Sequence, residues 1–201
     1  MKKYLWLLLL NIVFISCSST KYFKEKVDLC GLVVDENNQP IPYFEMTCID
    51  SKGTIEYAIT NENGIFVFQN KKSGSYVLNG KKNGWTKLTD KKINFIDYRQ
   101  MTCCKVWSIE KTLETVKQMI FQKDYEAAFF SIDKIYVDEM SLVEITVLFH
   151  KVFLLMKMNE KEKSKFFYEK LLFSVKNQEK DNYFRNEIDE LQKLLEWRNE
   201  E

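Results

Sequence analysis

Histidine, proline and the sequence motifs of common enzymes are scarce or missing in this chain. Its 201 residues include two prolines and one histidine, His150. Catalytic triads, histidine zinc sites and most acid–base pairs need a histidine with partners. The chain also lacks a Gly-x-Ser-x-Gly segment, a phosphate-binding loop and a dinucleotide fingerprint. We therefore expect a non-catalytic protein with no metal and no cofactor, and we interpret His150 as a core or helix-surface residue.

An excess of charge of either sign is missing as well. The chain carries 30 Lys and Arg residues against 29 Asp and Glu residues, and two of the lysines, Lys2 and Lys3, lie within residues 1–16. Proteins that bind nucleic acid through its phosphates need a basic surface. Because the remaining chain is close to neutral, we expect no nucleic-acid partner.

A basic start followed by a short apolar run opens the chain. The run covers residues 5–15 and is interrupted only by Asn11. It is too short to span a bilayer, which takes about 20 residues, and it has the length and flanking charge of a signal peptide. We therefore predict a signal peptide over residues 1–16. The alternative is an N-terminal membrane helix that is not cleaved.

The residues that end this run, Phe14-Ile15-Ser16-Cys17, resemble the bacterial lipobox, although Phe14 stands where the lipobox usually has Leu. The resemblance implies cleavage before Cys17 and attachment of fatty acyl chains, such as palmitate, through its thiol. Each buried methylene contributes about 0.8 kcal/mol, so two or three chains hold a protein on a membrane. Residues 17–26 would be the lipidated cysteine and its tether. Ser18, in place of Asp, resembles the outer-membrane sorting pattern, so we expect a cell-envelope protein on the outer membrane that faces the periplasm.

Short β-prone runs separated by turn residues fill residues 27–109. The runs recur about every ten residues, and Asn63-Gly64 is a strong hairpin signal. Several short strands with turns between them predict a β-sandwich.

The same part of the chain carries motifs that resemble the carboxypeptidase regulatory-like domain. The matching segments are Gly31-x-Val33-x-Asp35, Gln39-Pro40-Ile41-Pro42, Thr60 to Phe68, Gly74-x-Tyr76 and Asn83-Gly84-Trp85. Asn61 stands where that family prefers Asp, and Trp85 where it prefers Tyr. The resemblance implies a seven-stranded, transthyretin-like β-sandwich over residues 27–109. It implies no particular function, since the module accompanies enzymes, transporters and lipoproteins alike.

Four cysteines would remain after lipidation of Cys17, namely Cys30, Cys48, Cys103 and Cys104. In an oxidising compartment they allow two disulfides in three connectivities. A bond between the adjacent Cys103 and Cys104 would strain the peptide between them, and in a strand these side chains point to opposite faces. The alternative of a four-cysteine zinc site lacks a Cys-x-x-Cys pair. We expect free thiols with at most one disulfide.

The pattern changes to a helical period after Trp107. Ser108 is the expected N-cap of a helix that runs to about residue 121. Further helices are predicted over residues 125–136, 141–158, 162–176 and 181–198. The helix over 141–158 is strongly apolar but contains Glu144 and Lys151, so we expect a buried central helix and no membrane span. Because the connections are short, about five helices would form antiparallel hairpins over residues 110–201.

Part of this helical region resembles the tetratricopeptide repeat. Asp124-Tyr125-Glu126-x-Ala128, followed by Ile132 and Ile135, is similar to the second helix of that repeat. A weaker echo at Ser164, Tyr168 and Leu171 lies 36 residues later, close to the family spacing of about 34. The alternative is an unrelated helical bundle.

These features together favour a membrane-anchored protein that binds an envelope protein partner or acts as a scaffold. Helical hairpins bind peptides or helices in concave grooves, and an apolar stripe left uncovered on them would support this hypothesis. The alternative is a glycan-binding lipoprotein that uses sandwich aromatics such as Tyr57, Trp85 or Trp107, and it fails if those rings are buried. A third hypothesis is an architectural envelope component without a dedicated ligand.

Overall fold

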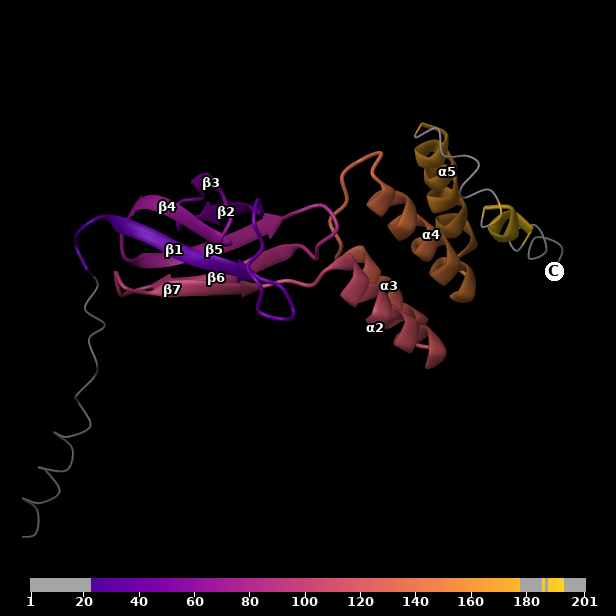
Figure 1. The fold of residues 1–201 in the computed structure, drawn as a ribbon, viewed down its shortest axis with the longest axis horizontal. Helices are drawn as coiled ribbons and strands as arrows, with labels where there is room; N and C mark the ends of the chain where they lie inside the picture. Colours follow the sequence, from indigo (N-terminus) through magenta and orange to yellow (C-terminus); the bar gives the residue numbers. More distant parts are fainter. Residues whose placement is uncertain (1–22, 178–185, 187, 194–201) are drawn as a thin grey trace, which may run out of the picture.

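The computed structural model describes residues 23–177, 186 and 188–193 (Figure 1). In this part of the chain, a unit of seven strands is followed by a unit of helices. The predicted signal peptide, Cys17 and most of the helix predicted over residues 181–198 lie outside the described residues.

The seven strands form two facing sheets. They are β1 (Val27–Val34), β2 (Glu45–Ile49), β3 (Ile55–Ile59), β4 (Ile65–Lys71), β5 (Gly74–Lys81), β6 (Leu88–Phe95) and β7 (Met101–Lys105). One sheet has the order β4-β1-β7 and the other β3-β2-β5-β6; β1 and β7 pair in parallel, and the other pairs are antiparallel. The prediction of a seven-stranded β unit followed by helices is confirmed.

The core of the sandwich consists of alternate strand residues from both sheets. Its largest fully buried side chains include Phe44, Phe66, Phe68 and Phe95. A side chain added at Gly31 would collide with the ring of Phe66, its partner on β4 in the same sheet, so this glycine leaves room for that ring in the core.

The hairpin expected at Asn63-Gly64 is instead the turn that carries the chain from β3 in one sheet to β4 in the other, and this turn depends on a polar side chain and a glycine. Asn61 Oδ1 accepts hydrogen bonds from the backbone N–H groups of Asn63 and Ile65, both at 3.0 Å. An asparagine therefore serves this turn as an aspartate would, because the backbone donors need only the side-chain oxygen. Gly64 has φ +70, and an added Cβ would lie 2.7 Å from the carbonyl oxygen of Val33.

The helical unit contains α2 (Ile109–Phe121), α3 (Tyr125–Asp133), α4 (Leu142–Lys157) and α5 (Lys161–Asn177). Ser108 caps α2 by accepting from the Lys111 N–H, as the sequence predicted, and Ser141 caps α4 in the same way. The main helix contacts are α2 with α3, α3 with α4, and α4 with α5. Among the described helices, none combines the length and the apolar character needed to cross a membrane.

The helix predicted over residues 125–136 is wrong at its C-terminal end, because α3 ends at Asp133. The backbone that follows instead pairs with the β5–β6 connection. The Lys87 N–H donates to the Lys134 oxygen at 2.8 Å, and the Tyr136 N–H donates to the Trp85 oxygen at 2.8 Å. Tertiary pairing therefore replaces the last turn of the helix.

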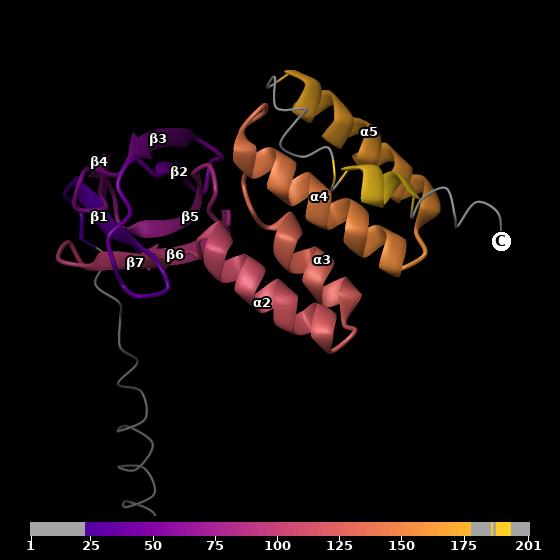
Figure 2. The same cartoon turned by 45° about the vertical axis from the view of Figure 1, so that its right-hand side comes forward.

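The β5–β6 connection joins the two units by backbone hydrogen bonds on both of its sides. Besides its bonds to residues 134–136, it bonds the start of the helical unit: the Thr86 N–H donates to the Trp107 oxygen at 2.9 Å, and the Ile109 N–H donates to the Gly84 oxygen at 2.8 Å. Figures 1 and 2 show the helices at one end of the sandwich, with α2 and α3 next to it. The helical unit is thus attached to the sandwich by more than the covalent chain.

Candidate functional site

The described cysteines lie on strands of the sandwich, and the single histidine lies on helix α4. Cys30, Cys48, Cys103 and Cys104 are all free thiols. Cys103 is exposed and Cys104 buried, as strand alternation requires. Burial raises the pKa values of Cys48 and Cys104 to about 11, which keeps both thiols protonated and unreactive at neutral pH. His150 packs its ring near Phe149 and bonds the Thr146 carbonyl through Nδ1 at 2.8 Å.

No cluster of three or more His, Cys, Asp or Glu side chains suited to a metal occurs among the described residues. The four thiols are also dispersed: Cys48 belongs to one sheet, whereas Cys30, Cys103 and Cys104 belong to the other. The structure therefore brings none of these residues together as a site.

The three aromatic residues considered for glycan binding have different exposures. Tyr57 is 78% exposed on β3, and Trp107 is 46% exposed. Trp85 is partly buried and packs against the sandwich core. Tyr57 lines a hollow of about 510 Å³ beside β3 and β4, and Trp107 lines a larger cleft.

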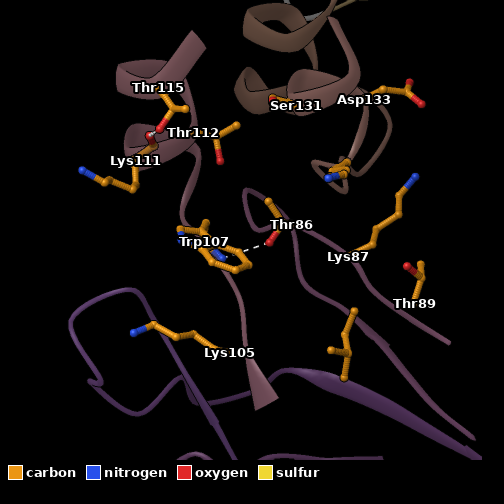
Figure 3. A pocket seen from close by; sticks show the side chains of 12 residues that line it. Thr86, Lys87, Thr89, Lys105, Trp107, Lys111, Thr112, Thr115, Ser131 and Asp133 are labelled. Atoms are coloured by element: carbon orange, nitrogen blue, oxygen red, sulfur yellow. Dashed lines mark hydrogen bonds between the residues drawn. The ribbon is translucent and has the colours of Figure 1, made fainter. Parts of the chain in front are cut away.

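This cleft, of about 610 Å³, lies where the sandwich meets α2 and α3, and we call it the junction cleft (Figure 3). Its lining residues are Thr86, Lys87, Leu88, Thr89, Lys105, Trp107, Lys111, Thr112, Thr115, Ser131, Asp133 and Lys134. Figure 3 shows the Trp107 ring beside Thr86, with Thr112 of α2 above it. The backbone N–H of Trp107 donates to Thr86 Oγ1 at 2.9 Å, and the backbone N–H of Thr86 donates to the Trp107 carbonyl oxygen. This reciprocal pair fixes the backbone from which the indole projects.

The polar lining of the junction cleft is mainly basic and hydroxylic. It includes four lysines and one acid, Asp133, which forms a 2.6 Å ion pair with Lys151 of α4. Lys111 pairs with Glu114 at 2.7 Å on the rim. The hydroxyl groups of Thr112, Thr115 and Ser131 donate to helix carbonyls one turn earlier. Their oxygens remain available as acceptors.

The chemistry available in the junction cleft is that of binding. An aromatic face beside hydroxyls and ammonium groups can stack on an apolar ring face and hold polar or anionic substituents. Histidine and cysteine are missing from its lining, and Asp133, the one acid there, is paired with Lys151.

Another hollow, of about 400 Å³, lies on the helical unit, and we call it the α5 hollow. Its apolar lining residues are Met140, Phe166 and Phe173, which are 53%, 52% and 64% exposed. Its polar lining residues are Glu139, Glu144, Glu169, Lys170 and Ser174.

Glu144 holds the floor of the α5 hollow together through two hydrogen bonds. One carboxylate oxygen of Glu144 accepts the Met140 N–H at 2.7 Å and the Ser174 hydroxyl at 2.6 Å. The Lys170 ammonium lies 4.6 Å from the centre of the Phe166 ring. The hollow therefore combines exposed apolar side chains with a polar floor made by Glu144 and Ser174 and with charged groups around them.

The α5 hollow was missed in the sequence, although a signal was present. Phe166 and Phe173 are seven residues apart and so share one helix face, whereas Leu171 and Val175 lie on another face that is buried. Apolar residues on two faces of one helix indicate a second contact surface. Leu191, near the end of the described chain, joins the buried side of this helix.

Comparisons with known proteins give no family for this chain. No family model matches it, and no curated protein matches it. Among solved structures, the Bacillus anthracis TIE protein is 16% identical with a TM-score of 0.36, over 42% of this chain and 17% of that one. BcpA, the major pilin subunit of Bacillus cereus, is 16% identical with a TM-score of 0.32, over 41% of this chain and 29% of that one.

A DUF3823 family protein from Parabacteroides merdae is 14% identical with a TM-score of 0.32, over 41% of this chain and 45% of that one. The chain thus spans less than half the length of each of these proteins. Likenesses at this level assign neither a family nor a role, so the function of the chain rests on what the junction cleft and the α5 hollow can bind.

Proposed function

We propose that this chain is a non-catalytic lipoprotein of the cell envelope, anchored by acyl chains on Cys17, whose helical unit binds another envelope protein. The observation that carries the proposal is the α5 hollow, where Phe166 and Phe173 remain more than half exposed on a helix whose other face is buried. Exposed aromatic side chains in a concave apolar site are typical of protein-binding surfaces. The anchoring part rests on the lipobox-like residues before Cys17, and the outer membrane, on its periplasmic side, is the location we propose.

The packing of the helices supports a repeat-like helical unit. The small or apolar residues Ala128 and Ile132 of α3 are fully buried, as are Ser164 and Leu171 of α5. Ala128 and Ser164 occupy equivalent places 36 residues apart. Each helix packs mainly on its neighbours in sequence, which is how stacked helical hairpins are built. We propose on this basis that the helices are tetratricopeptide-like and that the sandwich is of the carboxypeptidase regulatory-like, transthyretin-like kind.

The test is cross-linking and recovery of the tagged full chain from intact cells. The variant Phe166→Glu with Phe173→Glu places two charges in the hollow, and we expect it to reduce recovery of a stoichiometric partner at least tenfold. The matched control is Phe121→Glu, since Phe121 is 90% exposed on α2 and does not line the hollow. Unchanged recovery with the double variant would contradict the proposal.

Glycan binding is a second candidate function, and the junction cleft is the observation that favours it. Trp107 offers a half-exposed indole, and four lysines line the same cleft. The ligand would be a saccharide that carries carboxylate groups. Retention of the full chain on envelope polysaccharide would fall at least tenfold for Trp107→Ala and remain unchanged for Tyr57→Ala. Equal retention of both variants would exclude the cleft as the glycan site.

A further inference from the structure

The end of the sandwich farthest from the helices carries exposed apolar residues in one turn. The turn between β6 and β7 covers residues 96–100, and with the first residue of β7 it exposes Ile96, Tyr98 and Met101 by 40%, 61% and 56%. We call residues 96–101 the tether-end turn. Figure 1 shows the β6–β7 connection at the end of the sandwich opposite α2 to α5.

The tether-end turn is held in one shape by its own polar groups. The Gln100 N–H donates to the Asp97 carbonyl at 2.9 Å, which closes a β-turn with Tyr98 and Arg99 at its tip. The Asp97 side chain accepts the Arg99 N–H at 2.9 Å, and Gln100 Oε1 accepts the Ile96 N–H at 3.2 Å. The turn therefore presents Tyr98 at a fixed position, with little entropy left to lose on binding.

The first described residue is attached at the same end. The Phe23 ring makes an edge contact with Phe95, the last residue of β6, at 5.0 Å between centroids. The Ser73 hydroxyl donates to the Phe23 carbonyl at 2.9 Å. The path from Cys17 to Phe23 covers six residues, which can reach at most about 20 Å when fully extended. A lipid on Cys17 would therefore keep this end of the sandwich close to the bilayer.

We propose that the tether-end turn docks on the bilayer in which Cys17 is anchored, with Tyr98, Ile96 and Met101 in the interfacial layer. The inference rests on the lipidation of Cys17 in the proposed function. Tyrosine favours the membrane interface, because its ring is apolar and its hydroxyl stays wet. Arg99, which is 75% exposed and lies 5.4 Å from the Tyr98 ring centroid, can bond lipid phosphate groups.

Docking at this end fixes where the helical unit lies. The eight residues of β1 run from the tether end toward the helices and span about 26 Å. The hydrogen-bonded β5–β6 connection then holds α2 and α3 at the far end. The α5 hollow would be held away from the lipid, where a partner in the periplasm can reach it.

The test places the photoreactive residue p-benzoylphenylalanine at position 98 of the full chain, made in cells that attach lipid to it. Irradiation of intact membranes should give a phospholipid adduct, detected by mass, at least ten times more abundant than at position 57. Tyr57 is the matched control, because it is the more exposed tyrosine at 78% and lies on the flank of the same sandwich. A third probe replaces Phe130, which is 63% exposed on α3, and should give no phospholipid adduct because it reports on the helical unit.

The outcomes separate the docking from the anchoring. Incorporation of labelled palmitate that is lost in Cys17→Ser supports the lipoprotein proposal, and its absence overturns that proposal whatever position 98 does. With palmitate incorporated, equal lipid adducts at positions 98 and 57 would overturn the docking alone. A protein adduct at position 98, in place of lipid, would also overturn it and would assign the turn to a protein partner.

Discussion

The sandwich and the helical unit bury their phenylalanine residues to different extents. In the sandwich, Phe44, Phe66, Phe68 and Phe95 are at most 2% exposed and belong to one core cluster. In the helical unit, Phe121, Phe130, Phe166 and Phe173 are between 52% and 90% exposed. The sandwich thus uses its phenylalanines for its own stability, whereas the helices leave several of theirs available for contacts outside the chain.

This contrast should be largest in the loss of stability when the ring of a phenylalanine is removed. Phe66→Ala should lower the free energy of unfolding by about 3–5 kcal/mol, because a fully buried ring leaves a cavity between the two sheets. Phe173→Ala should change it by less than about 0.5 kcal/mol, since that ring is 64% exposed. Urea unfolding followed by circular dichroism measures both. A cost above about 2 kcal/mol for Phe173→Ala would mean that this ring stabilises the helices.

Two glycines with positive φ, Gly64 and Gly53, allow the cost of backbone strain to be measured separately from the cost of a steric collision. Gly64→Ala should cost about 1–2 kcal/mol for its left-handed backbone and roughly 1–3 kcal/mol more for the contact of its Cβ with the Val33 carbonyl. Gly53 has φ +82 and open space around it, so Gly53→Ala should cost the strain alone. Thermal unfolding of the two variants gives the difference. Equal losses would show that the β3–β4 turn shifts to accept the new methyl group.

Much of this arrangement was predictable from the sequence, because local signals decided it. The turn residues Asn61 and Gly64 marked the β3–β4 turn, and their hydrogen bonds and positive φ explain why, although the two strands belong to different sheets and form no hairpin. Ser108 marked the start of α2, since a serine side chain satisfies a free N–H of the first turn. Each of these signals acts within a few residues.

The parts that were not predicted depend on contacts between distant segments. The end of α3 was placed three residues too late, because residues 134–136 pair with residues 84–87 and no local pattern records this. The junction cleft could not be foreseen for the same reason. Trp85 and Trp107 are both tryptophans near turns, and only the packing of the two units makes one partly buried and the other a cleft residue.

The stability of the sandwich should also depend on pH at alkaline values. Two buried thiols, Cys48 and Cys104, lie in the sandwich, where burial raises their pKa from 9.0 to about 11. The unfolded chain loses these protons near pH 9, whereas the native sandwich keeps them until about pH 11. The native state therefore binds more protons in this window, and its stability is full below pH 9 and falls as pH rises toward 11.

Urea unfolding at pH 8, 9.5 and 11 measures this loss. The control is the double variant Cys48→Ala with Cys104→Ala, which should show a shallower fall because other groups alone then titrate. An identical pH dependence in the variant and the natural chain would contradict the role of the thiols.

The smallest expected effect tests whether the two units unfold together. Ser108 caps α2 and also donates through its hydroxyl to Glu36 of the sandwich at 3.0 Å. Ser108→Ala should cost about 1 kcal/mol for the cap. In a double-mutant cycle with Glu36→Ala, the coupling between the two side chains should be about 0.5–1.5 kcal/mol.

The cap of α4, Ser141, is a comparison within the helical unit, and Ser141→Ala combined with Glu36→Ala should be additive. Coupling between Ser108 and Glu36 in the free energy of unfolding requires that α2 and the sandwich are lost in the same transition. If the cycle with Ser108 is also additive, the backbone bonds of the β5–β6 connection hold the units together without help from this side-chain pair. If the unfolding curve instead splits into two transitions, the helices and the sandwich are independent, and the fixed distance between the bilayer and the α5 hollow is lost.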